Sequence, residues 1–413
     1  MGRMRPGGAT RRDAPGPAGA PAWAWRLALG LALGALAVTA AALLLGQRLP
    51  SGGFAADACE RLQAVGERVV GQELALGQAA HAICDHLQDP APERPLVLAA
   101  HGPPGVGKSF FHRVAAGALY GVETEAAGGR GGWSCPGAGC PGYVVLFGMD
   151  YLADEHERQA AAIKESLERH LRTYPEAFVV VEEYDKLDCR ARGFFRQLLD
   201  SGFGPGAARA VVLLESNAGY LDLHGLVAGP GRARDALRPE EAQRTLKNVV
   251  FERYSAEACE ARADTLKLVG LVHAYLPFLP LEAGHLRRVL ARALPERLGQ
   301  FHGAREGVTH RLEEGPAGEG LLDFLAEKAE FDGGFALEGA KEAGTILSRY
   351  VTPQYRRFLR AEGWGRGGGR AGGGGRSPPA VVRVGLAEDG SGARFSAQAG
   401  EGGGGGEGGR AGA

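Results

Sequence analysis

The sequence predicts an α/β fold, in which a parallel sheet carries helices on both faces and a smaller helical domain follows. Three observations lead to this prediction. A glycine-rich loop at residues 102–109 stands between a short apolar run and a helical pattern, the context that a phosphate-binding loop requires. Apolar runs then alternate with helical patterns as far as residue 214, which is typical of a parallel sheet. After Phe251 the pattern is only helical, which indicates a separate unit.

Composition and charge limit the classes of function that the chain can have. The chain has 413 residues, and its 47 lysines and arginines nearly balance 48 acidic residues, so the formal charge of -1 gives no reason to expect nucleic-acid binding. Glycine is enriched, with 67 residues, and much of this excess lies in the tail after Arg360 and in a few loops. We expect a disordered arm over residues 1–26 and a disordered tail over residues 361–413.

The segment Leu27–Gly46 is an uncharged apolar run. A helix of about 20 residues spans the hydrocarbon layer, whereas the apolar core of a signal peptide usually has about 7–15 residues. We therefore expect an uncleaved transmembrane helix over residues 27–47, although Ala40–Ala42 offers small residues for cleavage of a signal peptide. Because five arginines precede the run, the N-terminus should remain cytoplasmic.

The predicted nucleotide domain covers residues 53–245. It begins with a helical pattern between Phe54 and Gln88, and a further helix is expected at Ile163–Leu171. Four buried strands are expected, at Leu96–Ala100, Tyr143–Phe147, Ala177–Val181 and Ala210–Leu214. Cys135 and Cys140 flank a short loop, where a local disulfide or half of a metal site are both open interpretations.

The predicted helical domain covers residues 250–360. Its candidate helices are Leu281–Leu294, Leu321–Glu330 and Thr345–Phe358. These segments carry apolar residues at helical spacing, so each can bury one face against the others.

The glycine-rich loop is a candidate site for the phosphates of ATP. It reads Gly102, Pro103, Pro104, Gly105, Val106, Gly107, Lys108 and Ser109, a full match to the P-loop pattern. Glycines let backbone N–H groups approach phosphate oxygens, and the helix that follows adds the positive end of its dipole. Lys108 supplies a positive charge for the phosphates, and Ser109 supplies a hydroxyl for Mg²⁺.

Polar residues follow two of the predicted strands. Glu182 and Glu183 end one strand, an arrangement in which the first carboxylate supports Mg²⁺ and the second activates a water molecule. The first position is usually aspartate, and Glu182 is one methylene longer. Ser216-Asn217 follows the next strand, where the amide of Asn217 can orient that water, although an asparagine there is also a common turn residue.

These residues carry a resemblance to the torsins, a subfamily of the Clp-related AAA+ ATPases, over roughly Leu62–Val351. The similar segments are Val70-Gly71-Gln72, the P-loop, Glu182–Leu187, Leu214–Gly219, Tyr275–Glu282 with His285, and Phe335–Lys341. The resemblance implies an AAA+ nucleotide domain with a small helical lid. It also implies ATP and Mg²⁺ as cofactors, catalytic roles for Glu183, Asn217 and Lys341, and metal binding by Ser109 and Glu182.

The resemblance further implies partners and a place in the cell. Torsins reside in the endoplasmic reticulum lumen and the nuclear envelope, form homo-oligomers, and take an arginine finger from a lumenal membrane-bound activator. The chain departs from the family pattern at Glu182, at Ser109, where many torsins have asparagine, and at Ala340, which replaces a cysteine. The leading hypothesis is ATP-driven remodelling of proteins or membranes. The alternative is a nucleotide-gated assembly protein with negligible hydrolysis.

Overall fold

The computed structural model describes residues 52–124, 132–136, 139–148, 156–187, 189–201, 206–229, 234–258, 261–301, 308–362 and 381–398, which all lie in the compact unit Pro50–Ala413. The predicted transmembrane segment and the arm before it lie outside these residues. Among the helices in the described ranges, none has the length and apolar character needed to cross a membrane.

A five-stranded parallel sheet forms the centre of the described unit, in the order β4-β5-β6-β1-β7. Its strands are β1 (Leu96–His101), β4 (Tyr143–Phe147), β5 (Phe178–Glu182), β6 (Val211–Ser216) and β7 (Ala274–Pro277). The four strands expected from apolar runs are all present. The expectation of helices alone after Phe251 is wrong, because β7 lies in that segment and pairs with β1 along one edge of the sheet.

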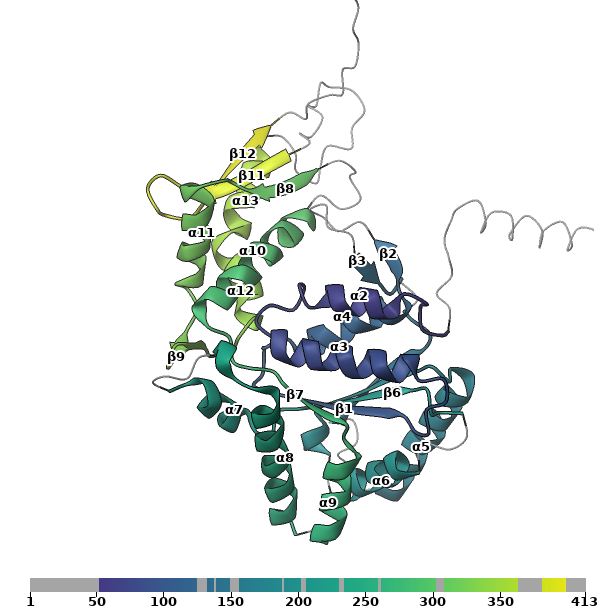
Figure 1. Cartoon of the computed structure of the whole chain (residues 1–413). Coiled ribbons are helices and arrows are strands. Elements are labelled where there is room, and N and C mark those ends of the chain that lie inside the picture. The colour runs from purple at the N-terminus through teal and green to yellow at the C-terminus, as the bar shows by residue number, and fades with distance from the viewer. Residues whose placement is uncertain are drawn as a thin grey trace, which may run out of the picture. The chain divides into compact units, whose positions relative to one another are not determined.

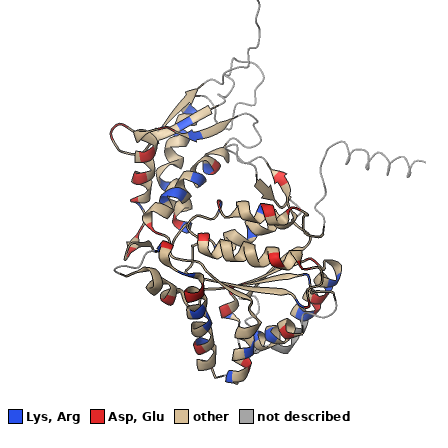
Figure 2. Cartoon of the chain, viewed as in Figure 1, with Lys and Arg blue, Asp and Glu red and all other residues tan. Residues whose placement is uncertain are grey.

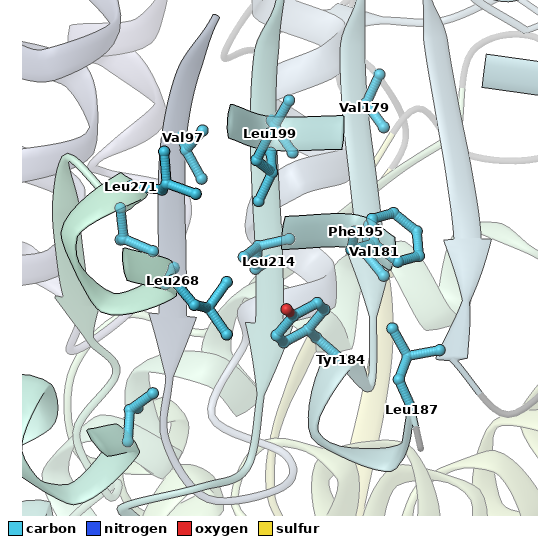
Figure 3. Packing of buried hydrophobic residues seen from close by; sticks show 14 of the residues in the cluster. Val97, Val179, Val181, Tyr184, Leu187, Phe195, Leu199, Leu214, Leu268 and Leu271 are labelled. Carbon is cyan, nitrogen blue, oxygen red and sulfur yellow. The ribbon is translucent and has the colours of Figure 1, made fainter. Parts of the chain in front are cut away.

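Helices cover both faces of this sheet (Figure 1). One face packs against α2 (Ala58–Val65), α3 (Glu73–Gln88) and α4 (Lys108–Tyr120). The other face packs against α5 (His156–Thr173), α6 (Cys189–Asp200), α8 (Pro239–Ala256) and α9 (Arg262–Leu271). Figure 3 shows this second core, where Tyr184, Leu187 and Phe195 lie beside Val181 and Leu214 of the strands. Since β1, β5, β6 and β7 are almost entirely buried, they read as largely apolar runs in the sequence.

Charged residues are scattered over the helices, whereas the central strands are almost free of them (Figure 2). The sequences of the five strands contain two charged residues, Glu182 and Glu215. Glu182 is the last residue of β5, and Glu215 is the penultimate residue of β6. Both therefore lie at the carboxyl edge of the sheet, where ligands bind in open α/β folds.

A third hydrophobic cluster forms the helical lid. It contains α10 (Ala283–Gly299), α11 (Pro316–Ala326), α12 (Lys341–Tyr350) and α13 (Thr352–Ala361). Leucines at every fourth position of α10 are fully buried. The third expected lid helix is split, because α13 begins anew at Thr352 with Pro353 in its first turn. The lid cluster starts after Glu282, so the boundary lies later than the predicted 245–250, and α8 and α9 belong to the nucleotide domain.

Part of the predicted disordered tail is folded. β11 (Val381–Leu386) pairs with β8 (Thr309–Leu312) in parallel and with β12 (Ala393–Gln398) in antiparallel register. Val382 and Val384 are buried in the lid cluster, while Arg383 between them is exposed. The prediction of disorder is therefore wrong for residues 381–398, because this short segment alternates apolar and polar residues within a glycine-rich tail.

The remaining described elements are short. α7 (Tyr220–Val227) follows the end of β6, and β2 (Val122–Thr124) pairs with β3 (Gly132–Ser134). In the lid, β9 (Phe331–Asp332) and β10 (Phe335–Ala336) form a small hairpin. Among the described residues, 3₁₀ turns also lie at Tyr184–Lys186 and Arg234–Ala236.

Two disulfides stabilise the nucleotide domain. Cys135 pairs with Cys140, which decides between the two interpretations of that loop in favour of a disulfide. A second bridge, between Cys59 of α2 and Cys84 of α3, was not predicted. It joins two neighbouring helices on one face of the sheet, with 5.4 Å between the Cα atoms.

We expect the two bridges to differ in their contribution to stability. The residues of the Cys59–Cys84 pair are 25 apart, and loop-closure entropy then gives about 3.5 kcal/mol. Those of the Cys135–Cys140 pair are 5 apart, which gives about 2 kcal/mol. Urea unfolding of the two double-alanine variants, followed by circular dichroism, should show the larger loss for Cys59/Cys84. The reverse order would contradict an entropic origin.

Candidate functional site

The P-loop connects β1 to α4 at the carboxyl edge of the sheet. β1 ends at His101, and α4 begins at Lys108. Gly105 and Gly107 have φ angles of 78° and 104°, a left-handed conformation that residues with a Cβ seldom adopt. A Cβ on Gly105 would also collide with the carbonyl oxygen of Glu338 in the lid. The glycines are thus needed both for the shape of the loop and for close approach of the lid.

Lys108 is buried and is held by three oxygen atoms. Its Nζ donates hydrogen bonds to the carbonyl oxygens of Gly102 and Pro103, at 2.8 and 2.9 Å, and to Oδ1 of Asn217, at 2.8 Å. Burial lowers the pKa of Lys108 to about 8, and the carboxylate of Glu215 opposes this effect. The structure therefore brings two predicted site residues, Lys108 and Asn217, into direct contact.

The lowered pKa of Lys108 predicts a pH dependence of ATP binding. Phosphate binds the charged ammonium form, and that form is half depleted at about pH 8 in the free protein. The dissociation constant for ATP should therefore change little near pH 7, where Lys108 is mostly charged. Above pH 8, ATP binding requires Lys108 to take up a proton, so the dissociation constant should rise with a limiting slope of about tenfold per pH unit.

A titration with fluorescent ATP between pH 7 and 9.5 measures this dependence. The control is Lys108→Arg, because a guanidinium remains protonated over this range and its curve should stay flat at whatever affinity it has. Equal slopes in the two proteins would assign the effect to another group.

Glu183 stands directly after β5 in a strained conformation. Its φ angle is 53°, in the left-handed region, and its carbonyl oxygen lies so close to Gly148 that a Cβ there would collide with it. Such backbone strain is often found at functional sites. The negative charge of Glu183 also raises the pKa of Lys108 slightly, which places the carboxylate near the P-loop.

Asp185 fixes the backbone of Asn217. The buried Oδ1 of Asp185 accepts a hydrogen bond from the backbone N–H of Asn217 at 3.0 Å. The side chain of Asn217 is then turned toward Lys108. Asp185 is therefore a positioning residue that connects the ends of β5 and β6.

Ser109 and Glu182, the two predicted metal ligands, have different partners. Ser109 Oγ donates to both carboxylate oxygens of Glu215, at 2.9 and 3.1 Å. Glu182 Oε1 lies 2.7 Å from Nε2 of His112, whose Nδ1 is 2.6 Å from the hydroxyl of Tyr143. The hydrogen bond with His112 lowers the pKa of Glu182, whereas burial raises the pKa of Glu215.

Gln72 ties the start of the domain to the P-loop and to the end of β7. Its buried side-chain amide donates to the carbonyl oxygens of Val106 and Leu279, at 3.1 and 2.9 Å, and accepts from the N–H of Leu279 at 2.8 Å. Replacement by a hydrocarbon side chain would leave these buried groups unsatisfied. This contact gives a structural reason for the Gly71-Gln72 pair.

The lid reaches the P-loop through the turn before α12. The N–H of Ala340 donates to the carbonyl oxygen of Gly105 at 2.8 Å. Gly339 has a φ angle of 59°, and a Cβ on it would lie 2.7 Å from the same oxygen. Lys341 begins α12, and its charge contributes to lowering the pKa of Lys108. The predicted lid lysine therefore lies close to the phosphate-binding loop.

Arg234 serves as a clamp within the chain. Its guanidinium donates to the carbonyl oxygens of Gly71 and Pro280, and burial lowers its pKa. These contacts occupy the side chain in the described unit, which disfavours Arg234 as an arginine finger.

The site thus contains more residues than the sequence predicted. The structure places Glu182, Glu183, Asn217 and Lys341 near the P-loop residues Lys108 and Ser109. Sequence reasoning missed His112, Tyr143, Asp185 and Glu215. A usable signal existed for two of them, because His112 stands three residues after Ser109 on one helix and Glu215 two residues before Asn217.

Comparison with known proteins gives one family. The Torsin family model matches residues 55–126, which include the P-loop. A torsin-like protein from Drosophila melanogaster is 23% identical over 239 residues, which cover 56% of this chain and 64% of the relative. Torsin-3A from Rattus norvegicus is 26% identical over 233 residues, which cover 53% of this chain and 54% of the relative. The matched region therefore spans less than two thirds of each relative.

Proposed function

We propose that this chain is a member of the torsin family of AAA+ ATPases, and that it binds ATP with Mg²⁺ and hydrolyses it to remodel proteins or membranes. One observation carries the proposal. Lys108 of the P-loop, Asn217 after β6 and the lid residue Lys341 gather at the carboxyl edge of the sheet, although they are far apart in the sequence. A helix N-terminus, a buried lysine and a second lysine from the lid suit a polyphosphate.

The residues around the P-loop also suit a divalent cation. Ser109 and the carboxylates of Glu182 and Glu215 offer oxygen atoms, the ligands that Mg²⁺ prefers. Bound Mg²⁺ would neutralise charge on the β- and γ-phosphates. To bind Mg²⁺, Ser109 must give up its hydrogen bond to Glu215. The Glu215 carboxylate then becomes a third oxygen donor, beside Ser109 and Glu182.

The proposed catalytic step depends on the chain's own side chains. Glu183 accepts a proton from the attacking water, because its carboxylate directly follows β5 and lies near Lys108 of the P-loop. When phosphate oxygens replace Asn217 as acceptors of the Lys108 ammonium, the Asn217 side chain turns to the γ-phosphate or to that water. Lys341 approaches the γ-phosphate from the lid, which links the presence of that phosphate to the position of the lid.

We place the protein in the secretory pathway, in the endoplasmic reticulum lumen and the nuclear envelope. Two disulfides support an oxidising compartment, and both relatives carry torsin names. Leu27–Gly46 would anchor the chain with its N-terminus in the cytoplasm. A homo-oligomer and a lumenal membrane-bound activator that supplies an arginine finger complete the proposal.

The second candidate function is a nucleotide-gated assembly protein with negligible hydrolysis of its own. The observation that favours it is the pairing of Ser109 with Glu215 and of Glu182 with His112. Both predicted metal ligands are engaged elsewhere, so the hydrolytic geometry requires rearrangement.

Phosphate release by the purified chain, alone and with the lumenal domain of a torsin activator, distinguishes the two functions. Remodelling ATPase activity predicts turnover that rises with the activator. ATP-dependent assembly without turnover under either condition supports the second function. Absence of ATP binding would refute both.

A further inference from the structure

We propose that His112, Glu182 and Glu215 bind one transition-metal ion, and that the chain holds this ion without nucleotide. The three side chains come from α4, β5 and β6 and meet beside Ser109. The inference goes beyond the proposed Mg²⁺, which P-loop proteins bind largely through the phosphates of their nucleotide. It requires no ATP, so it stands or falls separately from the proposed function.

The distances already approach those of a metal site. One ligand atom from each side chain lies within 4.8 Å of the other two. Nε2 of His112 is 2.7 Å from Glu182 Oε1 and 3.7 Å from Glu215 Oε2. Bonds of about 2.0–2.2 Å in tetrahedral geometry place neighbouring ligand atoms about 3.3–3.5 Å apart. Carboxylate rotations that shift atoms by about 1 Å or less would therefore admit an ion.

Burial and charge favour a cation at this position. The side chain of His112 is 2% exposed and that of Glu215 is 10% exposed. Glu182 and Glu215 are the two charged residues of the five central strands, and they stand side by side. Buried carboxylates require compensation by a cation or by hydrogen bonds. A divalent ion would balance both charges, whereas the imidazole lies 2.7 Å from Glu182 and 3.7 Å from Glu215, whose other partner here is the neutral hydroxyl of Ser109.

Tyr143 can prepare His112 as a ligand. The Tyr143 hydroxyl lies 2.6 Å from Nδ1, on the side of the ring away from the carboxylates. Metal-binding histidines almost always donate their second N–H to such an outer partner, which fixes the ring and its tautomer. In the metal-bound form His112 is the neutral tautomer in which Nε2 gives its lone pair to the metal and Nδ1–H donates to the tyrosine oxygen.

The ligand set selects the class of metal. An imidazole nitrogen suits Zn²⁺, Co²⁺, Fe²⁺ or Ni²⁺ better than Mg²⁺, which prefers oxygen ligands alone. Three protein ligands leave the fourth tetrahedral position open. The hydroxyl of Ser109, which donates to Glu215, lies beside this group of ligands. Because Glu182 and Glu215 are shared with the proposed Mg²⁺ site, an ion here would regulate how that site is used.

The test is a titration of the full purified chain with Co²⁺ after chelation and without nucleotide, read by visible absorption. We expect one equivalent to bind with the spectrum of a nitrogen–oxygen site. His112→Ala and Glu215→Gln should each weaken binding by at least about tenfold, and Tyr143→Phe by about 10–100-fold, the usual effect of an outer-shell partner. The control is His81→Ala, since His81 is exposed on α3 and pairs only with Asp85 in the described unit; it should leave the affinity unchanged.

Two results would overturn the inference. These are uptake of Co²⁺ only together with ATP, and equally tight binding of Co²⁺ to His112→Ala. Circular dichroism monitors folding, and His112→Asn replaces His112→Ala if the alanine variant unfolds. Binding of fluorescent ATP with Mg²⁺ is measured separately, and its failure would refute the proposed function while leaving the Co²⁺ result intact.

Discussion

Lys108→Ala is expected to weaken ATP binding by at least about 100-fold. Lys108 is the charged residue that the P-loop itself contributes, and its ammonium has three oxygen partners that phosphate oxygens can replace. A hydrogen bond to a charged group contributes about 1.5–3 kcal/mol, so two lost contacts amount to about 3 kcal/mol or more. Fluorescence anisotropy with labelled ATP measures the change.

The matched control for Lys108→Ala is Lys164→Ala. Lys164 is an exposed lysine of α5 whose ion pair with Glu168 is also exposed, so ATP affinity should not change. Thermal unfolding of both variants separates a loss of binding from a loss of fold. Micromolar ATP binding by Lys108→Ala would refute the assignment of residues 102–109 as the nucleotide site.

Local patterns account for the parts of the fold that the sequence predicted. Strands β1, β5 and β6 are buried along nearly their whole length, so each appears as an apolar run that ends at a polar residue, and the edge strand β4 is also a continuous apolar run. The P-loop has a fixed spacing of glycines, lysine and serine, so its position at the start of α4 could be predicted from these residues alone.

The errors arise where long-range contacts decide the structure. β7 has four residues and ends at Pro277, so neither its length nor its pattern separates it from a loop until β1 pairs with it. β11 lies in a glycine-rich tail and is stabilised by β8, which precedes it by some 70 residues. The contacts of His112 with Glu182 and Glu215 likewise join residues 70 or more positions apart. No short segment of the sequence contains both residues of any of these contacts.

Glu183→Gln is expected to preserve ATP binding and to lower turnover by about 10²–10⁴-fold. An amide of the same length keeps the shape of the side chain but cannot accept the proton of the attacking water. The backbone should be unaffected, because glutamine and glutamate bear the same strain at a φ angle of 53°. Incubation of excess protein with radiolabelled ATP, followed by analysis of the bound nucleotide, measures a single turnover even where multiple turnover is slow.

The wild-type protein should accumulate bound ADP in this assay, whereas Glu183→Gln should retain ATP. Glu241→Gln is the control, since Glu241 is an exposed residue in the first turn of α8 and its loss should not change the conversion. Equal conversion by Glu183→Gln and wild type would show that another group accepts the proton. Asp185 would be the next candidate, because it already contacts the backbone of Asn217 at the same edge of the sheet. If Asp185 were that group, Asp185→Asn would trap ATP in place of Glu183→Gln.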